Sequence, residues 1–271
     1  MTQETSPKAI VVFDIDGVVR DVSGSYRRAI ADTVEYLTTQ AYRPTPLDID
    51  QLKSEGVWNN DWEASQELIY RYFETQGQTR KQLQLDYNAI VAFFQSRYRG
   101  PDPKNLTGYI CNEPLLLQLS YLEQLTQAGI PWGFFSGATR VSANYILEKR
   151  LGLQSPVLIA MEDAPSKPDP TGLFATVRQL ENGIEQRSAI VYVGDTVADM
   201  YTVEKAQALD SSRTWIGVGV LPPHVQETAA HSNAYGETLL AAGAAIVLRN
   251  VQELSPKQIQ ELVSSSAQSV F

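Results

Sequence analysis

The apolar residues of this chain gather in short runs, separated by stretches with helical spacing. Six of these runs are bounded by Gly, Pro or polar residues, as strands are. They cover residues 9–13, 132–135, 157–160, 189–193, 214–218 and 244–248. Between them apolar residues recur every three or four positions, as at Leu115, Leu119 and Leu122. This alternation predicts an α/β fold, in which a doubly wound parallel sheet carries helices on both faces and binds its ligand beyond the carboxyl ends of the strands.

The segment from residue 21 to 108 interrupts the alternation. It shows no convincing strand, and its apolar residues follow helical spacing over 26–37, 62–73 and 87–98. Gly, Pro and Ser residues typical of hinges lie at both of its ends. We therefore predict a helical unit over residues 21–108, inserted into a core made of residues 1–20 and 109–271.

Two acidic residues end the first predicted strand. Asp14 and Asp16 are separated by one residue and followed by Gly17. Alternation along an extended chain points both carboxylates the same way, and glycine allows a sharp turn just beyond them. Such carboxylates repel each other, so a positive group, most simply a hard metal ion, is expected between them. Taken alone, the same pattern also fits a solvated turn.

Three further polar clusters each follow an apolar run, and the order of the clusters along the chain carries information about the family. They are Phe134–Gly137, Ser166–Pro170 and Val191–Asp199. With the first pair of acids, the four clusters resemble the signature of the haloacid dehalogenase (HAD) superfamily, in its phosphoglycolate-phosphatase-like branch. The resemblance implies a Rossmann-like core with a mobile helical cap, which corresponds here to residues 21–108.

The resemblance also implies a mechanism for the two acids. A phosphate monoester resists attack because its oxygens are negative, so a catalyst must neutralise that charge and supply an aligned nucleophile. By resemblance, Asp14 is the nucleophile that forms an aspartyl-phosphate, and Asp16 is the general acid and base. Spacing alone does not identify which carboxylate attacks.

A metal site is predicted from carboxylates at two strand ends. Asp195 and Asp199 follow a strand and, at a spacing of four, converge on one side of the next helix start. With Asp14 and Asp16 they form the predicted ligand set, and oxygen ligands without histidine suit Mg²⁺. The acid/base role of Asp16 requires its side chain to stay off the metal. The alternatives are a helix N-cap for Asp195 and a helix-dipole partner for Asp199.

Phosphate binding is assigned to the remaining two clusters. Ser136 and Gly137 offer a hydroxyl and a free backbone N–H at a helix start, although a capping Ser-Gly turn has the same pattern. Lys167, in a loop stiffened by Pro168 and Pro170, is expected to cancel charge on Asp14 and on the phosphate. A solvated lysine is the alternative.

The helical segment holds a candidate specificity loop. Trp58, Asn59 and Asn60 could stack on a polar ligand and hydrogen-bond to it, or an asparagine could instead cap the following helix while the indoles pack inside. Arg20 and Arg27 are candidates to face the same cleft.

Composition narrows the class of partner. The net charge is −9 with a pI near 4.8, and no basic cluster suggests a nucleic-acid groove. The first residues contain no long apolar segment of a signal peptide and no apolar run approaches a membrane span, so a cytoplasmic protein is expected. The single cysteine, Cys111, excludes an internal disulfide. We predict a Mg²⁺-dependent phosphatase for a small phosphorylated metabolite. The alternatives are a sugar phosphomutase and a non-catalytic protein that binds phosphate or a partner; the substrate and the oligomeric state stay open.

Overall fold

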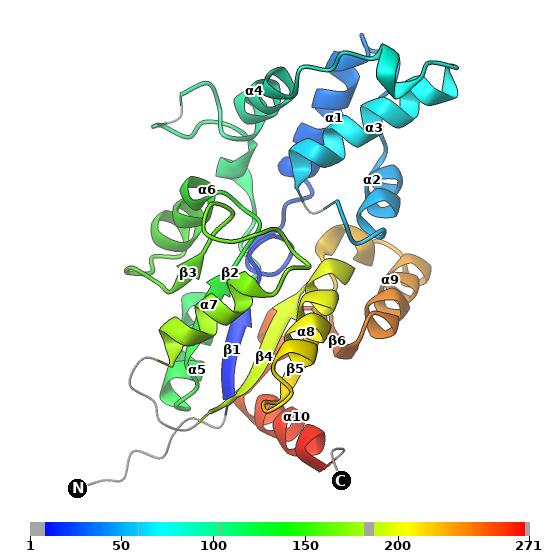
Figure 1. Cartoon of the computed structure of the whole chain (residues 1–271). Helices are drawn as coiled ribbons and strands as arrows, with labels where there is room; N and C mark the ends of the chain where they lie inside the picture. Colours follow the sequence, from blue (N-terminus) through cyan, green and yellow to red (C-terminus); the bar gives the residue numbers. More distant parts are fainter. Residues whose placement is uncertain (1–8, 59, 103, 182–186, 269–271) are drawn as a thin grey trace, which may run out of the picture. The chain divides into compact units, whose positions relative to one another are not determined.

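The computed structural model describes residues 9–58, 60–102, 104–181 and 187–268, and the chain forms two compact units (Figure 1). One unit comprises Met1–Asp21 and Leu115–Phe271, and the other Val22–Pro114. Residues 109–114, predicted in the core, belong to the helical unit, and Asp21, predicted in the helical unit, belongs to the core. Tyr109 explains the first difference, because its hydroxyl donates a hydrogen bond of 2.7 Å to Asp32 of the helical unit.

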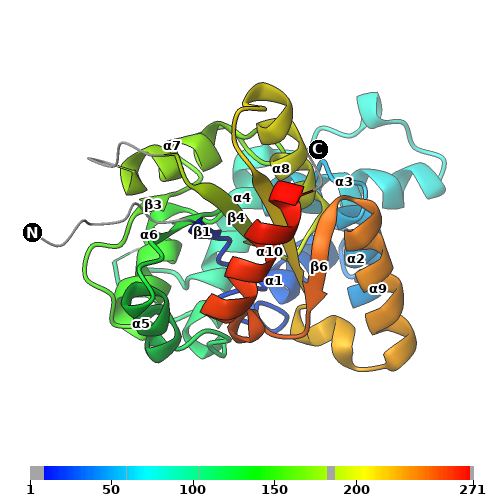
Figure 2. The ribbon, with the colours of Figure 1, turned by 90° about the horizontal axis from the view of Figure 1, so that it is seen from below.

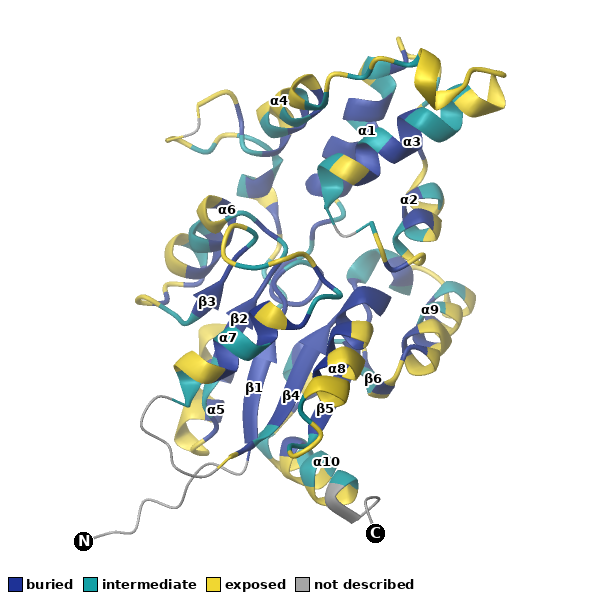
Figure 3. Ribbon diagram, viewed as in Figure 1, coloured by how far each residue is buried: buried dark blue, intermediate teal, exposed yellow. Residues whose placement is uncertain are grey.

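The first unit is built on six parallel strands in the order β3-β2-β1-β4-β5-β6. They are β1 (Ala9–Phe13), β2 (Trp132–Phe135), β3 (Leu158–Ile159), β4 (Ala189–Gly194), β5 (Trp215–Val220) and β6 (Ala244–Leu248). The predicted doubly wound α/β fold is confirmed, and each predicted apolar run overlaps one strand, although β4 ends one residue and β5 two residues beyond its run. β-Branched residues dominate the central strands, which are buried along their length (Figure 3).

Helices cover both faces of this sheet. α7 and α8 pack on one face, and α5 and α10 on the other (Figure 2). The helical elements of this unit are α5 (Leu119–Gln127), α6 (Arg140–Asn144), η3 (Tyr145–Arg150), α7 (Thr171–Leu180), α8 (Val197–Leu209), η4 (Pro223–Gln226), α9 (Ala229–Ala241), η5 (Val251–Glu253) and α10 (Pro256–Gln268). One core cluster joins β1, β4 and α7 through Val12, Tyr192 and Leu173.

The sheet order creates a switch point between β1 and β4. From β1 the chain proceeds to β2 and β3 on one side, and from β4 to β5 and β6 on the other. Phe13 pairs with Val193 in register, so both strands end at the same level. Ligands of such sheets bind outside the carboxyl ends of the strands at this switch point.

The second unit is helical, as predicted. Its elements are α1 (Tyr26–Leu37), α2 (Pro46–Lys53), α3 (Asp61–Thr75), η1 (Arg80–Gln82), α4 (Tyr87–Tyr98) and η2 (Tyr109–Asn112). α1 packs against both α3 and α4, and Ile30, Ile69 and Phe94 are buried. Thr45 begins α2 through a capping box with Asp48. Within the described residues of both units, no helix has the length and apolarity needed to cross a membrane.

Candidate active site

Three buried carboxylates meet at the switch point. Asp14, Asp195 and Asp199 each offer a carboxylate oxygen, and these oxygens lie within 4.8 Å of one another. Asp14 directly follows β1, and its N–H donates to the carbonyl of Val193 over 2.8 Å, which ties it to β4. The structure therefore brings together acids that are far apart in the sequence.

Two glycines allow the acids to approach so closely. Gly17 has a φ of +74°, and a Cβ there would lie 2.1 Å from Oδ2 of Asp195. A Cβ on Gly194 would lie 2.3 Å from the Cβ of Asp199. A larger residue at either position would displace a carboxylate of the cluster.

Lys167 enters the same cluster from the loop before α7. Its Nζ lies 2.9 Å from Oδ1 of Asp14 and 2.6 Å from Oδ1 of Asp199. The lysine is buried, and its ammonium lies 5.4 Å from the ring centres of Phe135 and Tyr192. The alternative of a solvated lysine is therefore wrong, and the expected pairing with Asp14 is present.

The cluster sets three carboxyl groups against one ammonium. Burial, opposed by Lys167, raises the pKa of Asp14 to about 7. Burial, with the charges of Asp199 and Asp14, raises the pKa of Asp195 well above its ordinary value. Although burial alone would lower it, the neighbouring carboxylates raise the pKa of Lys167. A divalent cation would favour the ionised forms of these carboxyl groups, and a donor set made only of carboxylate oxygens fits Mg²⁺.

Asp199 has a structural role as well as its place in the cluster. Its Oδ1 accepts hydrogen bonds from Lys167 and from the Tyr192 hydroxyl, the latter over 3.0 Å. Its Oδ2 accepts from the backbone N–H and the hydroxyl of Thr196, over 3.0 and 2.7 Å. The bond from the Thr196 N–H is one half of the capping box of α8, and the other half is the Asp199 backbone N–H, which donates to the Thr196 side chain. The helix-start alternative therefore describes part of what Asp199 does. The N-cap itself is Thr196, and the alternative of Asp195 as N-cap is wrong.

Asp16 lies outside the carboxylate cluster. Its Oδ1 accepts a hydrogen bond from Nε of Arg20 over 2.6 Å and lies 2.5 Å from Nη2 of the same guanidinium. The turn through Gly17 brings Arg20 back beside it, since the Gly17 N–H donates to the carbonyl of Arg20 over 2.9 Å. This corrects the predicted four-residue ligand set, because within the described chain the metal-capable group is Asp14, Asp195 and Asp199.

Ser136 and Gly137 follow β2 at the carboxyl edge of the same sheet. The hydroxyl of Ser136 accepts a hydrogen bond from the N–H of Ala138 over 3.1 Å, as in a Ser-Gly capping turn. Ser136 is buried, and Gly137 is half-buried. A turn at Ser136 is thus present, but the N-cap of α6 is Thr139, so the two residues do not cap that helix. Phosphate binding by Ser136 and Gly137 stays a prediction.

Two tyrosines that were not among the predicted site residues form hydrogen bonds with its acidic residues. Tyr192 lies in the middle of a motif strand, where its hydroxyl could have been noted as a partner for Asp199. The hydroxyl of Tyr235, on α9, donates to the carbonyl of Asp195 over 3.0 Å. No local pattern links residues 40 positions apart, so only the fold reveals this contact.

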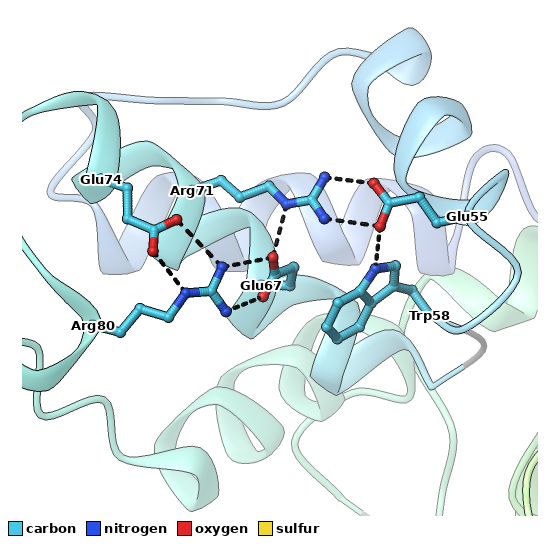
Figure 4. A network of polar contacts seen from close by, with 6 residues as sticks. All are labelled: Glu55, Trp58, Glu67, Arg71, Glu74 and Arg80. Atoms are coloured by element: carbon cyan, nitrogen blue, oxygen red, sulfur yellow. Dashed lines mark hydrogen bonds and ion pairs between the residues drawn. The ribbon is translucent and has the colours of Figure 1, made fainter.

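The candidate specificity loop is held by a network of charges within the helical unit (Figure 4). Arg71 binds Glu55 through two nitrogens, over 2.7 and 2.9 Å, and Glu67 through its Nε over 2.8 Å. The indole N–H of Trp58 donates to Glu55 over 2.7 Å. The network continues through Arg80, which binds both Glu67 and Glu74. Trp58 is therefore anchored by its polar edge.

The other predicted residues of this unit have structural contacts. Asn60 caps α3, because its Oδ1 accepts from the backbone N–H groups of Trp62 and Glu63, over 3.0 and 3.4 Å. Asn59 lies outside the described residues. Arg27 is buried and paired with Asp50, which does not support its assignment to a substrate cleft.

The chain matches a family model described as haloacid dehalogenase-like hydrolase over residues 8–207. It belongs to this family and is an enzyme of the hydrolase class, as the four clusters predicted. The matched range includes all four clusters and the helical insertion between the first two.

One curated relative shares substantial sequence. The imidazoleglycerol-phosphate dehydratase of Phytophthora nicotianae is 31% identical over 252 residues, which are 90% of this chain and 50% of that protein. This chain thus spans about half the length of the relative.

Solved structures share the fold at low identity. A phosphonoacetaldehyde hydrolase-like protein from Oleispira antarctica is 14% identical, with a TM-score of 0.69 over 99% of this chain and 98% of the other. Phosphatase Tt82 from Thermococcus thioreducens is 24% identical, with a TM-score of 0.60 over 77% and 92%. The β-phosphoglucomutase (pgmB) from Clostridium difficile is 14% identical, with a TM-score of 0.57 over 94% of this chain and 97% of the other. These similarities extend to the fold alone.

Proposed function

We propose that this enzyme is a Mg²⁺-dependent phosphatase that hydrolyses a small phosphorylated metabolite through an aspartyl-phosphate. The observation that carries the proposal is the placement of the Asp14 carboxylate, buried beside Lys167 and Asp195 where β1 and β4 end. A carboxylate held at a switch point, next to one cation and in a site able to bind another, is suited to attack a phosphate whose own charge must be neutralised.

Each residue has a defined role in the proposed reaction. An oxygen of Asp14 attacks phosphorus, the ester P–O bond breaks, and Asp16 transfers a proton to the leaving oxygen. Asp16 then takes a proton from water as that water attacks the aspartyl-phosphate, which releases inorganic phosphate and regenerates Asp14. Lys167 keeps Asp14 in position and offsets its charge. Mg²⁺, held by Asp14, Asp195 and Asp199, would supply Lewis-acid neutralisation of the phosphate.

A phosphate-release assay tests this proposal directly. The protein is freed of metal with EDTA, supplied with Mg²⁺ or left without it, and incubated with p-nitrophenyl phosphate and a panel of phosphorylated metabolites. We expect release only with Mg²⁺ and none from the Asp195→Ala variant at the same metal concentration. Equal release in chelator would refute the metal site, and no release from any ester would favour a non-catalytic protein.

A sugar phosphomutase is the second candidate, because one solved structure of this fold is described as a β-phosphoglucomutase. A mutase must shield its aspartyl-phosphate from water while an intermediate turns round. Incubation with sugar 1-phosphates separates the two activities. Free phosphate supports the phosphatase, whereas formation of a 6-phosphate with little free phosphate would replace it.

The curated relative suggests one substrate class for the panel. Its name describes an enzyme that acts on imidazoleglycerol phosphate, and this chain matches half of that protein. Because this chain has the proposed phosphatase site, we propose phosphate monoesters of imidazole-bearing alcohols as candidate substrates. A kcat/KM for these esters above that for glycerol 3-phosphate would support this class, and equal values would exclude a role for the imidazole.

We further propose a cytoplasmic enzyme that binds neither nucleic acid nor membrane, as its charge and hydropathy suggest.

A further inference from the structure

Arg20 is an unusual residue for the interior of this protein. Its side chain has no exposed surface and is the largest among the fully buried side chains of the described residues. Burying a guanidinium is costly unless it is paired and hydrogen-bonded. Asp16, four residues before Arg20, is one partner of this buried guanidinium and belongs to the first motif.

The main chain holds Arg20 on two sides. Its N–H donates to the carbonyl of Ile15 over 3.2 Å, and its carbonyl accepts from Gly17 over 2.9 Å. Bridge pairings join Arg20 to Asp16 within the turn and to Leu115 in the segment that returns to the core. The guanidinium is consequently presented from a fixed backbone, and its planar fork has little freedom to move.

The contact between the two side chains uses only one carboxylate oxygen of Asp16. Both Nε and Nη2 of Arg20 converge on Oδ1 of Asp16, over 2.6 and 2.5 Å. The Asp16 side chain is 24% exposed, whereas that of Arg20 is 0% exposed. The acid thus lies at the accessible edge of the pair, with the arginine beneath it.

We propose that Arg20 is the positioning residue of Asp16: it holds Oδ1 of the carboxylate, so that Asp16 presents its other oxygen to the leaving group and later to water. This inference rests on the proposed phosphatase function and deepens it. Arg20 itself does not touch substrate. Without it the Asp16 carboxylate would rotate among several orientations, few of which align with the reacting oxygen.

The experiment compares two esters that differ in their need for a general acid. Glycerol 3-phosphate leaves as an alkoxide and needs a proton, whereas p-nitrophenyl phosphate leaves as a stable phenolate and needs little help. For Arg20→Gln we expect kcat on the alkyl ester to fall by roughly 10²-fold and kcat on the aryl ester by less than about 5-fold, with both KM values near those of the unmodified enzyme. Arg20→Lys should recover part of the alkyl rate. Adding Arg20→Gln to Asp16→Asn should cost nothing further on either ester, because the two residues act as a unit.

A matched control separates positioning from the general loss of a buried arginine. Arg213 in the same unit is also largely buried, with a side chain 6% exposed and paired to Glu181 over 2.9 Å. Arg213→Gln should leave the ratio of alkyl to aryl rates unchanged. Circular dichroism and the Tm show which variants fold, and if Arg20→Gln does not fold, the ratio measured for Arg20→Lys decides.

An unchanged ratio in a folded Arg20 variant, with both rates equally reduced or both intact, would overturn the positioning role while leaving the phosphatase in place. Failure of the unmodified enzyme to hydrolyse either ester would refute the proposed function, and the positioning role with it.

Discussion

Each unit of this protein contains a cluster of charged side chains, and the two clusters differ in burial and balance. In the core, Lys167 and its partners Asp14 and Asp199 have side chains between 0% and 9% exposed. In the helical network, Arg71 and Arg80 are 41% and 46% exposed, and of their partners only Glu67, which both arginines bind, is buried. The core cluster sets three carboxylates against one ammonium, whereas both guanidinium groups of the network bind two carboxylates each. The ion pairs of the helical network hold the loop that contains Trp58 in place. The three buried carboxyl groups of the core, with one ammonium between them, indicate a site for a cationic ligand.

The physical reason is the different cost of charge in the two environments. Exposed ion pairs contribute about 0–1 kcal/mol each, because water already solvates their charges. A buried charge has lost that solvation and depends on its partners. Removing one member should therefore have very different effects in the two clusters.

The largest effect is expected from Asp14→Asn. Loss of the proposed nucleophile should reduce phosphate release by roughly 10⁴-fold or more, because an amide does not attack phosphorus. The metal-free variant should nevertheless be at least as stable as the unmodified chain at pH 8, since the substitution removes a buried negative charge whose pKa is raised to about 7. Asp210→Asn, at an exposed ion pair with Arg187, is the control and should keep full activity. Near-normal release by Asp14→Asn would disprove the assignment.

The second effect compares one cation from each cluster. Lys167→Met leaves the carboxylates of Asp14 and Asp199 without their cation and should lower the free energy of unfolding by about 3–5 kcal/mol. Arg71→Met in the helical network should lower it by about 1 kcal/mol or less. Urea titrations followed by circular dichroism measure both values. Equal losses would mean that burial does not distinguish the two clusters.

The third effect concerns Mg²⁺ and pH. The pKa of Asp14 in the folded chain is raised from 3.8 to about 7, so folding favours the protonated carboxyl group. Its contribution to the free energy of unfolding is fully present below pH 3.8 and is lost as the pH rises to about 7. The pKa of Asp195 is also raised, so its contribution has the same sign. Mg²⁺ binds the ionised carboxylates, and at about 100 times its Kd it should stabilise the chain by about 2–3 kcal/mol at pH 8. The rise in Tm on adding Mg²⁺ should therefore be larger at pH 8 than at pH 5.5; an equal rise at both, or the same rise in Asp195→Ala, would contradict the site.

The smallest effect is expected at the edge of the helical network. Trp58→Phe keeps an aromatic ring but loses the hydrogen bond from the indole N–H to Glu55, which should cost about 1 kcal/mol or less in stability. If the loop selects substrates, kcat/KM should change unequally across the metabolite panel and least for p-nitrophenyl phosphate. Glu55→Gln, which disturbs the same contact from its other side, should show the same ranking of substrates. A uniform change across all esters would favour a purely structural role for Trp58.

Local pattern predicted much of this protein. The apolar runs gave each strand of the sheet, because a buried parallel strand needs a short run of β-branched and aromatic residues wherever it lies in the chain. Helical spacing predicted α1, α3 and α4, because a helix that packs on one side needs apolar residues every three or four positions. The four motif clusters predicted the family, since each combines residue types with a fixed order along the chain. Asp14, Lys167 and Asp195 could be selected in this way because the carboxyl ends of parallel strands meet at one edge of the sheet.

Only the tertiary structure decided how these residues share their contacts. Asp16 is paired with Arg20 rather than grouped with the other acids, because the turn through Gly17 returns the guanidinium to it. Asp199 serves both Lys167 and the start of α8, and Tyr235 supports the carbonyl of Asp195 across 40 positions of sequence. The sequence by itself shows which residue types are present and how they are spaced. The orientation of each side chain depends on partners that folding brings from elsewhere in the chain.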